Sequence, residues 1–274
     1  MTGDAVTQEN LYLSPQMTPV SPTPESKGWL REVLAVIFIL GVLTALLLPA
    51  VQSSRGSAPR TNCRNNLKQL GLAFFSYHAE YGSFPPAVVC DDDGRPMHSW
   101  RVLLLPYLDQ QTLYSHYRFD EPWDGPNNIS LQDAMPDLYR CPGDHRGDEA
   151  SEIVRQHLHR LTNYVVVTSE DGLFSGSRMS GVTDIPDGHH HTLMTAEVRQ
   201  HAVHWMSPDD VTPGELLTDL RLSANDDDDN CNHGPGMNIG LADGSVRWIP
   251  HDFAEEFLRA LVTTDQADPI SADF

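Results

Sequence analysis

The chain has 274 residues, of which 40% are hydrophobic, and this is enough apolar material for one sizeable core. Its 38 acidic residues stand against 18 basic ones, so the formal net charge is −20 at pH 7. A surface of this sign repels a phosphate backbone, and we therefore expect no nucleic-acid partner. The composition also argues against a wholly disordered chain.

The N-terminal part of the chain is polar at first and then strongly apolar. Ser14–Ser26 is rich in Ser, Thr and Pro, so residues 1–28 are expected to form a disordered cytoplasmic leader. Val33–Val51 then runs for nineteen residues without a charge. A helix of about 20 residues crosses the ~30 Å hydrocarbon layer, so residues 29–51 are predicted to be a transmembrane helix. A buried helix of a soluble domain and a cleaved secretory signal are the alternatives.

A short segment with two helix-weakening residues separates this apolar run from the rest. Residues 52–61 are predicted to be a linker or a kinked helix, because Gly56 costs helix stability and Pro59 lacks a backbone donor. A continuous helix is expected to bend or break here. From about Asn62 to Tyr81, apolar residues recur at spacings of three and four, which predicts a helix with one face on the core.

Residues 62–264 are expected to form one domain, in which two helical patterns precede the strand patterns. A second helix is expected from Trp100 to about Tyr117, and four segments rich in β-branched or apolar residues predict strands. These are Asn163–Thr168, Thr192–Glu197, Met237–Leu241 and Ser245–Ile249. The predicted fold class is α+β, with an antiparallel sheet packed against helices and joined to a single N-terminal transmembrane helix.

The last two strands and the helix after them carry the clearest local signals. Asp243-Gly244 lies between two apolar runs and predicts a tight hairpin, because both turn residues tolerate positive φ. These two residues therefore have a structural reason to be present. Asp252 is expected to cap a final helix whose buried stripe includes Phe253, Phe257 and Leu261. Residues 265–274 are expected to be a C-terminal tail.

Several strings along the chain match known motifs in a fixed order. Lys27–Gln52 resembles the prepilin-type segment of type II secretion pseudopilins and type IV pilins, in which a basic leader ends in Gly before an aromatic residue. Arg60–Pro86 resembles the start of DUF1559, a family of pseudopilin-like proteins abundant in planctomycete bacteria. Further matching strings are His98–Tyr114, Tyr139–Asp144, Thr162–Val167, Val182–Arg199 and His233–Ile249. The last contains His233 and Asp243-Gly244 at the family's H-x9-DG spacing.

The resemblance implies a single-pass protein of the cell inner membrane with its C-terminal, periplasmic domain on the non-cytoplasmic side. It implies no established enzymatic activity, so we expect a structural or interaction protein of a secretion or cell-surface assembly. Its partners would be the membrane and other pilin-like subunits, contacted through the N-terminal helix. Glu32 supports this role, because a carboxylate at the start of a membrane helix needs a partner such as a neighbouring chain's terminal amine, or Arg31.

Two features of the resemblance concern covalent chemistry. The prepilin pattern places a processing site between Gly28 and Trp29, although only three residues separate Gly28 from Glu32 where family members have four. An uncleaved signal anchor is the alternative. Cys63 and Cys141 lie in family-like motifs, and the resemblance implies a disulfide between them in an oxidising compartment. The four cysteines contain no C-x-x-C pair, and buried or free thiols are the alternative.

The alternative function is a membrane-tethered exported domain, a sensor or an enzyme, that binds a ligand or metal through acidic and His-rich loops. No G-x-S-x-G, P-loop or HExxH motif occurs. At most two of His189, His190 and His191 could share a metal on one strand, and a solvated loop is the simpler interpretation. For His233, a structural hydrogen bond to the hairpin and metal ligation stand as equal alternatives.

The one candidate cofactor is Ca²⁺, for which hard oxygen ligands occur in the run NDDDDN. Its ligands would be four adjacent carboxylates, those of Asp226, Asp227, Asp228 and Asp229. A solvated charge cluster without a ligand is the alternative.

Calcium binding by this run is testable. Adjacent carboxylates repel one another, so Ca²⁺ should relieve the repulsion and raise the melting temperature of a fragment from about Arg60 onward. Affinity is expected at ~10⁻⁴ to 10⁻³ M, so ~10 mM calcium suffices in a thermal unfolding experiment. Replacing Asp227 and Asp229 by Asn should abolish the shift. An equal shift in that variant would identify the run as a solvated loop.

Overall fold

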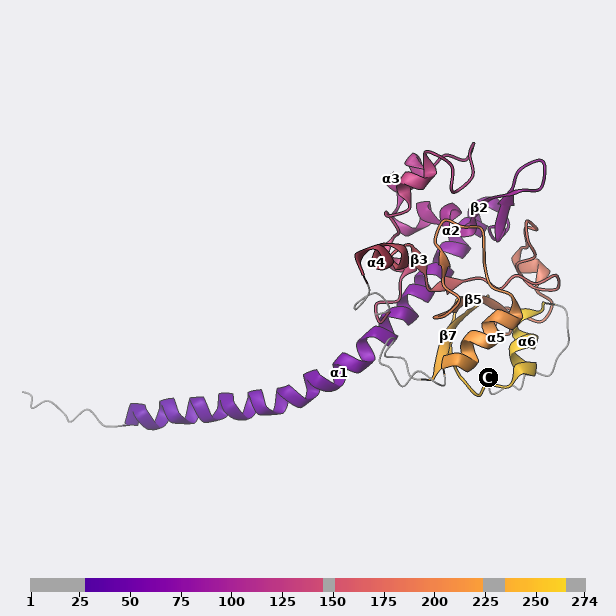
Figure 1. Ribbon diagram of the computed structural model, residues 1–274. Coiled ribbons are helices and arrows are strands. Elements are labelled where there is room, and N and C mark those ends of the chain that lie inside the picture. Colours follow the sequence, from indigo (N-terminus) through magenta and orange to yellow (C-terminus); the bar gives the residue numbers. More distant parts are fainter. Residues whose placement is uncertain (1–27, 145–150, 224–234, 265–274) are drawn as a thin grey trace, which may run out of the picture. The chain divides into compact units, whose positions relative to one another are not determined.

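The computed structural model describes residues 28–144, 151–223 and 235–264, with side chains placed from Trp29 to Leu43 and from Arg60 onward (Figure 1). The predicted leader up to Lys27 and the predicted tail lie outside these residues. The chain divides into two units, Met1–Ala50 and Val51–Phe274, which are taken in turn. Within the residues described, no helix combines the length and the apolar character that a membrane span needs.

The first element, α1 (Gly28–Tyr81), begins in the first unit and ends in the second. In the first unit, every residue from Trp29 to Leu43 is exposed, although most are apolar. The helix continues through Gly56 and Pro59, so the predicted linker or break does not occur, whereas the alternative of a kinked helix stays a prediction. A proline in a helix interior removes one hydrogen bond, and the neighbouring turns keep the helix together across it.

In the second unit, α1 is amphipathic and ends as predicted. Leu67, Leu70 and Phe74 are at most 1% exposed, at spacings that place them on one face. Gly82 follows with φ +78° and donates its N–H to the His78 carbonyl at 2.8 Å. A left-handed glycine of this kind commonly terminates a helix.

The main sheet has four antiparallel strands in the order β4-β5-β7-β8. Their bounds are β4 (Tyr164–Val165), β5 (Leu193–Glu197), β7 (Gly236–Leu241) and β8 (Val246–Pro250). All four predicted strands are confirmed, the first shortened to two residues. Two small antiparallel sheets pair β1 (Val88–Cys90) with β2 (Pro96–Ser99), and β3 (Leu161–Thr162) with β6 (Val203–His204).

Helices cover both faces of the main sheet, so β4, β5 and β7 are buried on both sides, whereas the edge strand β8 is partly exposed. Tyr164 and Val166 belong to the same core cluster as Leu67 and Phe74 of α1. The alternate residues, such as Val165, pack in a second cluster with α5 (Pro213–Leu222) and α6 (Glu255–Val262). This two-sided burial confirms the α+β class with an antiparallel sheet against helices.

The expected helix over Trp100–Tyr117 is three short elements. They are α2 (Trp100–Leu103), the 3-10 helix η1 (Leu105–Leu108) and α3 (Gln111–His116). Pro106 cannot donate within the helix, and Asp109 adopts a left-handed φ of 58°, so the chain turns twice. The remaining helices are η2 (Asn128–Leu131), η3 (Asp137–Tyr139), α4 (Glu152–Leu158) and η4 (Val182–Asp184).

The final helix starts later than predicted. Its N-cap is Ala254 and not Asp252, because the Phe253 N–H donates to the Pro250 carbonyl at 3.0 Å and closes a turn directly after β8. Of the predicted stripe, Leu261 is buried and Phe257 is half-buried on the helix, whereas Phe253 is half-buried and precedes it. The prediction is therefore confirmed in part.

The β7–β8 hairpin is confirmed, with a three-residue turn in place of a two-residue one. Gly244 has φ +81° and donates its N–H to the Leu241 carbonyl, whereas Asp243 does not have positive φ. Asp243 Oδ1 instead accepts the Ser245 N–H at 2.8 Å. A type I turn followed by a left-handed glycine is the usual geometry of a three-residue hairpin loop.

The start of β7 provides a stability prediction. Gly236 has φ +151°, and a Cβ there would lie 2.4 Å from the Ile249 carbonyl oxygen and 2.6 Å from the Trp248 ring. Gly236→Ala should therefore destabilise the protein by about 2–3 kcal/mol, from backbone strain and overlap together. Thermal unfolding of full-length protein in detergent should show a melting temperature ~4–12 °C lower.

Gly214→Ala in α5 is the matched control. A Cβ there meets only Thr212 Oγ1, at 4.0 Å, and alanine favours a helix, so its melting temperature should stay or rise. Equal melting temperatures for Gly236→Ala and the parent protein would contradict the close approach at this position.

Candidate functional site

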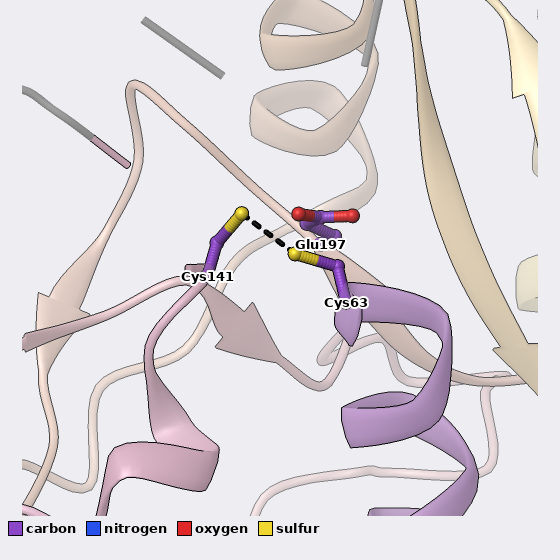
Figure 2. Close-up of side chains that lie close together, drawn as sticks. All are labelled: Cys63, Cys141 and Glu197. Carbon is purple, nitrogen blue, oxygen red and sulfur yellow. Dashed lines mark hydrogen bonds between the residues drawn. The ribbon is translucent and has the colours of Figure 1, made fainter. Parts of the chain in front are cut away.

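Two cysteines and one glutamate meet on the α1 side of the main sheet (Figure 2). Cys63 lies on α1, Cys141 follows η3, and Glu197 ends β5. The two sulfurs are 2.7 Å apart, and both lie with a Glu197 carboxylate oxygen within a 4.8 Å group. All three residues are at most 3% exposed. Within the ranges described, this is the one such group of metal-ligand side chains.

The helix and strand periodicities explain why these side chains meet. Cys63 is four residues before Leu67, so it continues the buried face of α1. Ala196 packs toward α5 and α6, so Glu197 points to the opposite face of β5. Across the sheet, Ala196 pairs with Ile239, and Asn238 Nδ2 donates to Glu197 Oε2 at 2.7 Å.

Hydrogen bonds fix the loop that carries Cys141. Its N–H donates to Asn163 Oδ1 at 2.9 Å, and Asn163 Nδ2 donates to Asp144 Oδ2 at 3.0 Å. From the helix side, Asn66 Nδ2 donates to the Arg140 carbonyl at 3.2 Å. The backbone at Cys141 is therefore held from two directions, and its sulfur is directed at Cys63.

Tyr164 lies between the cluster and the hydrophobic core. Burial, followed by the negative charge of Glu197, raises the pKa of Tyr164 well above its ordinary value, so the phenol stays protonated. Its hydroxyl oxygen accepts a hydrogen bond from Asn66 Nδ2 at 3.2 Å. On the other side, Asn238 Oδ1 is buried and has no hydrogen-bond partner among the residues described.

The cluster has two chemical options, a sulfur–sulfur bond or a bound metal ion. Zinc binds thiolate sulfur at ~2.3 Å, and two sulfurs at a tetrahedral angle then lie ~3.8 Å apart. The 2.7 Å separation observed is much shorter than this. The arrangement as it stands therefore favours chemistry between the sulfurs over a metal ion between them.

The other predicted site residues are not part of this cluster. Gly28 is the first residue of α1, and Trp29 and Glu32 are exposed in its first two turns. Asp243 and Gly244 form the hairpin turn, where His190 Nδ1 lies 3.9 Å from Asp243 Oδ2. His233 lies outside the residues described, as does the candidate calcium ligand set Asp226, Asp227, Asp228 and Asp229.

The His-rich string is a turn, as the simpler interpretation had it. The His189 ring bonds to the Val182 carbonyl at 2.9 Å, and His190 and His191 contact each other.

Sequence reasoning did not single out Glu197, Tyr164, Asn66 or Asn238. A signal was present for two of them, because Glu197 and Asn238 are polar residues inside otherwise apolar strands. A charged or amide side chain at such a position needs a partner when it is buried.

A second buried polar group lies on the same side of the sheet, between α2, β4 and the segment before α5. Arg101 Nη2 is 2.6 Å from Asp210 Oδ1, and both side chains are fully buried. Asp210 also accepts the Trp100 indole N–H at 2.9 Å and the Val166 N–H at 3.0 Å. Burial raises the pKa of Asp210 to about 6, and Arg101 opposes this shift. Every polar side-chain atom of the pair makes a hydrogen bond within the protein, so we interpret the pair as structural.

The fold and the cluster define an α+β protein with a sealed cysteine pair beneath an antiparallel sheet. The chain belongs to the family described as "Protein of unknown function (DUF1559)", whose pattern matches residues 52–219. This confirms the resemblance to DUF1559. The prepilin-type segment up to Gln52 and the motif in His233–Ile249 lie outside the matched residues or at their edge, and they stay predictions. No curated protein and no solved structure matches the chain.

The buried ion pair generates a prediction. Asp210→Asn would leave the Arg101 charge buried without its counter-ion, at an expected cost of ~3–5 kcal/mol in the free energy of unfolding. Adding Arg101→Met should recover part of this loss, because no unpaired charge then remains. Denaturant unfolding of the full-length protein in detergent measures both variants.

Asp133→Asn is the control for the ion pair. Asp133 pairs with Arg160 at 2.7 Å, but 65% of its side chain is exposed, so the expected change is at most about 1 kcal/mol. Similar losses at Asp133 and Asp210 would show that burial does not govern the strength of these pairs.

Proposed function

We propose that the protein is a non-enzymatic, membrane-anchored, pseudopilin-like subunit of a secretion or cell-surface assembly. It is held in the inner membrane by α1 and presents its α+β domain on the non-cytoplasmic side. The single observation that carries the proposal is the run of exposed apolar side chains in the first unit.

This run covers the whole circumference of the helix and not one stripe. Phe38 is 71% exposed and Trp29 is 66% exposed, and their neighbours along the helix are similar. The exposed large apolar residues are Trp29, Leu30, Val33, Leu34, Val36, Ile37, Phe38, Ile39, Leu40, Val42 and Leu43. A helix that is apolar all round belongs in a bilayer or among other helices, because water offers its side chains no partners.

The sequence extends this apolar character beyond the side chains that are described. No charged residue occurs between Val33 and Val51, which gives nineteen residues, close to the ~20 that span a bilayer. Arg31 and Glu32 precede the run and would lie at its boundary, where a neighbouring subunit's charge or amine could engage the carboxylate.

The same helix supplies part of the domain core in its second half. Leu67, Leu70 and Phe74 are buried in the main cluster, so α1 cannot separate from the domain without opening that core. One helix thus connects the proposed assembly segment to the exported domain, and a subunit built in this way needs no catalytic site to act in a larger structure.

Membrane attachment is tested by washing membranes at alkaline pH and at high salt. The intact protein should stay in the membrane fraction, because nineteen apolar residues outweigh peripheral electrostatic attachment. Ile39→Arg combined with Val42→Arg should release a large fraction, since each central arginine costs ~2.5–3.5 kcal/mol of insertion free energy.

Leu72→Arg is the matched control for the wash. Leu72 is an equally exposed apolar residue of α1, at 68%, but it lies in the second unit. Its substitution should leave retention unchanged. Release of the unaltered protein by either wash would remove the basis of the proposed anchor.

Sequencing the N-terminus of the protein recovered from membranes separates two forms of the proposal. A start at Trp29 establishes pilin-type processing of a subunit, whereas a start at Met1 leaves a permanently anchored protein with its leader retained.

A further inference from the structure

We propose that Cys63 and Cys141 form a disulfide in the exported protein, and that this bond fastens α1 to the sheet domain where the helix enters the core. The inference deepens the proposed function and rests on it, because export supplies the oxidising compartment. What is new is the role of the bond: it attaches α1 to the domain mechanically, and it is buried away from solvent.

The position of Cys63 along α1 indicates this role. Arg60, Thr61 and Asn62 are exposed, and Cys63 is the first buried residue that follows. Any force that pulls on the helix from its N-terminal side therefore reaches the Cys63 contact before the apolar contacts of Leu67 and Leu70. A covalent bond at this place would stop the helix from peeling off the sheet.

Two non-covalent contacts of polar or charged side chains lie near this point. The guanidinium of the exposed Arg60 lies over the ring of the half-buried Trp248, at 4.6 Å from its centroid. Asn66 donates to the Arg140 carbonyl at 3.2 Å. These contacts orient the helix, and a covalent bond between the two buried sulfurs would hold it independently of solvent.

The two sulfurs are already in place for the bond. They lie 2.7 Å apart, and Cys63 and Cys141 are at most 1% exposed. Residues 63 and 141 are 78 positions apart in the chain, so the bond closes a long loop and restricts the unfolded chain strongly. The Asn163 and Asn66 hydrogen bonds described above hold the Cys141 loop toward the helix.

The oxidation balances with a protein disulfide as oxidant. The two thiols release two protons and two electrons as the sulfur–sulfur bond forms. A disulfide of a thiol-oxidase protein in the exported compartment takes up both electrons and both protons and becomes a dithiol. Because both sulfurs are sealed in the folded domain, this exchange precedes closure of the core, and reductant reaches the bond only after unfolding. The pair is therefore a structural crosslink and not a redox catalyst.

The first experiment uses full-length protein extracted from membranes in detergent, then denatured without reductant and alkylated, so that buried free thiols also react. Mass spectrometry should find a linked Cys63–Cys141 peptide, with Cys90 alkylated. Dithiothreitol should break the link in denatured protein and leave it intact in folded protein. Alkylated Cys63 and Cys141 in this denatured, unreduced protein would overturn the proposal. So would stoichiometric bound zinc that is lost on Cys63→Ser, since the cluster would then be a metal site.

The second experiment measures what the bond does. The double variant Cys63→Ala/Cys141→Ala should lose about 10 °C in melting temperature, the shift expected for opening a long loop in a domain of this size. Wild-type protein refolded in reductant should lose the same amount. Cys90→Ser is the control and should melt like the parent, because Cys90 lies on β1 and is not a member of the Cys63–Cys141 group. If reduced and oxidised wild-type protein have the same melting temperature, the bond does not hold α1 to the domain. This result decides the question even if the double variant fails to fold.

The wash experiment separates this inference from the proposed function. If the crosslink is found but the wash releases the protein, the disulfide is supported and the membrane anchor is contradicted. If the wash retains the protein but both thiols are free, the membrane anchor is supported and the disulfide is contradicted.

Discussion

The packing of α1 on one face of the main sheet is the contact on which the rest of the structure depends. Phe74 lies at its centre, with ring centroids 5.0 Å from Trp100 and 5.7 Å from Phe174. A fully buried side chain of this size contributes ~1.5–3 kcal/mol by leaving water. The helix and the β7–β8 hairpin are also in contact at Gly71 and Gly244, since a Cβ on Gly71 would lie 3.5 Å from the Gly244 Cα, an ordinary van der Waals distance.

Polar groups buried around this contact specify how the helix and sheet are joined. Arg101 and Asp210 fix α2 against β4, and the Tyr139 hydroxyl donates to the Arg101 carbonyl at 2.7 Å. Glu197 and Asn238 pair across β5 and β7 beside the cysteines. Each group is costly to bury alone, so only the arrangement that pairs them is stable.

The two halves of α1 meet different physical requirements. The first half exposes apolar residues on every side and needs a non-aqueous environment or neighbouring helices. The second half presents one apolar face and completes a core. Cys63 stands at the start of that buried face. The cysteine pair therefore lies where the helix begins to pack on the domain core.

The sequence by itself determined the elements whose signals are local. Patterns of apolar and turn-forming residues within a few neighbouring positions predict three such elements. They are the helical repeat of α1 beyond Asn62, strand β5 and the β7–β8 hairpin. It did not determine the turn at Asp109, where left-handed backbone divides the helix expected there. Nor did it determine that Asp252 is displaced as a cap by the turn after β8.

Only the tertiary structure decided that Cys63, Cys141 and Glu197 meet. A periodic pattern shows which face of an element is buried, but it carries no information on which other face covers it. That choice depends on the long-range register, such as Ala196 opposite Ile239, and on the close approach of two glycines between helix and hairpin. These are properties of the packed core, because residues far apart in the chain must fill the same space.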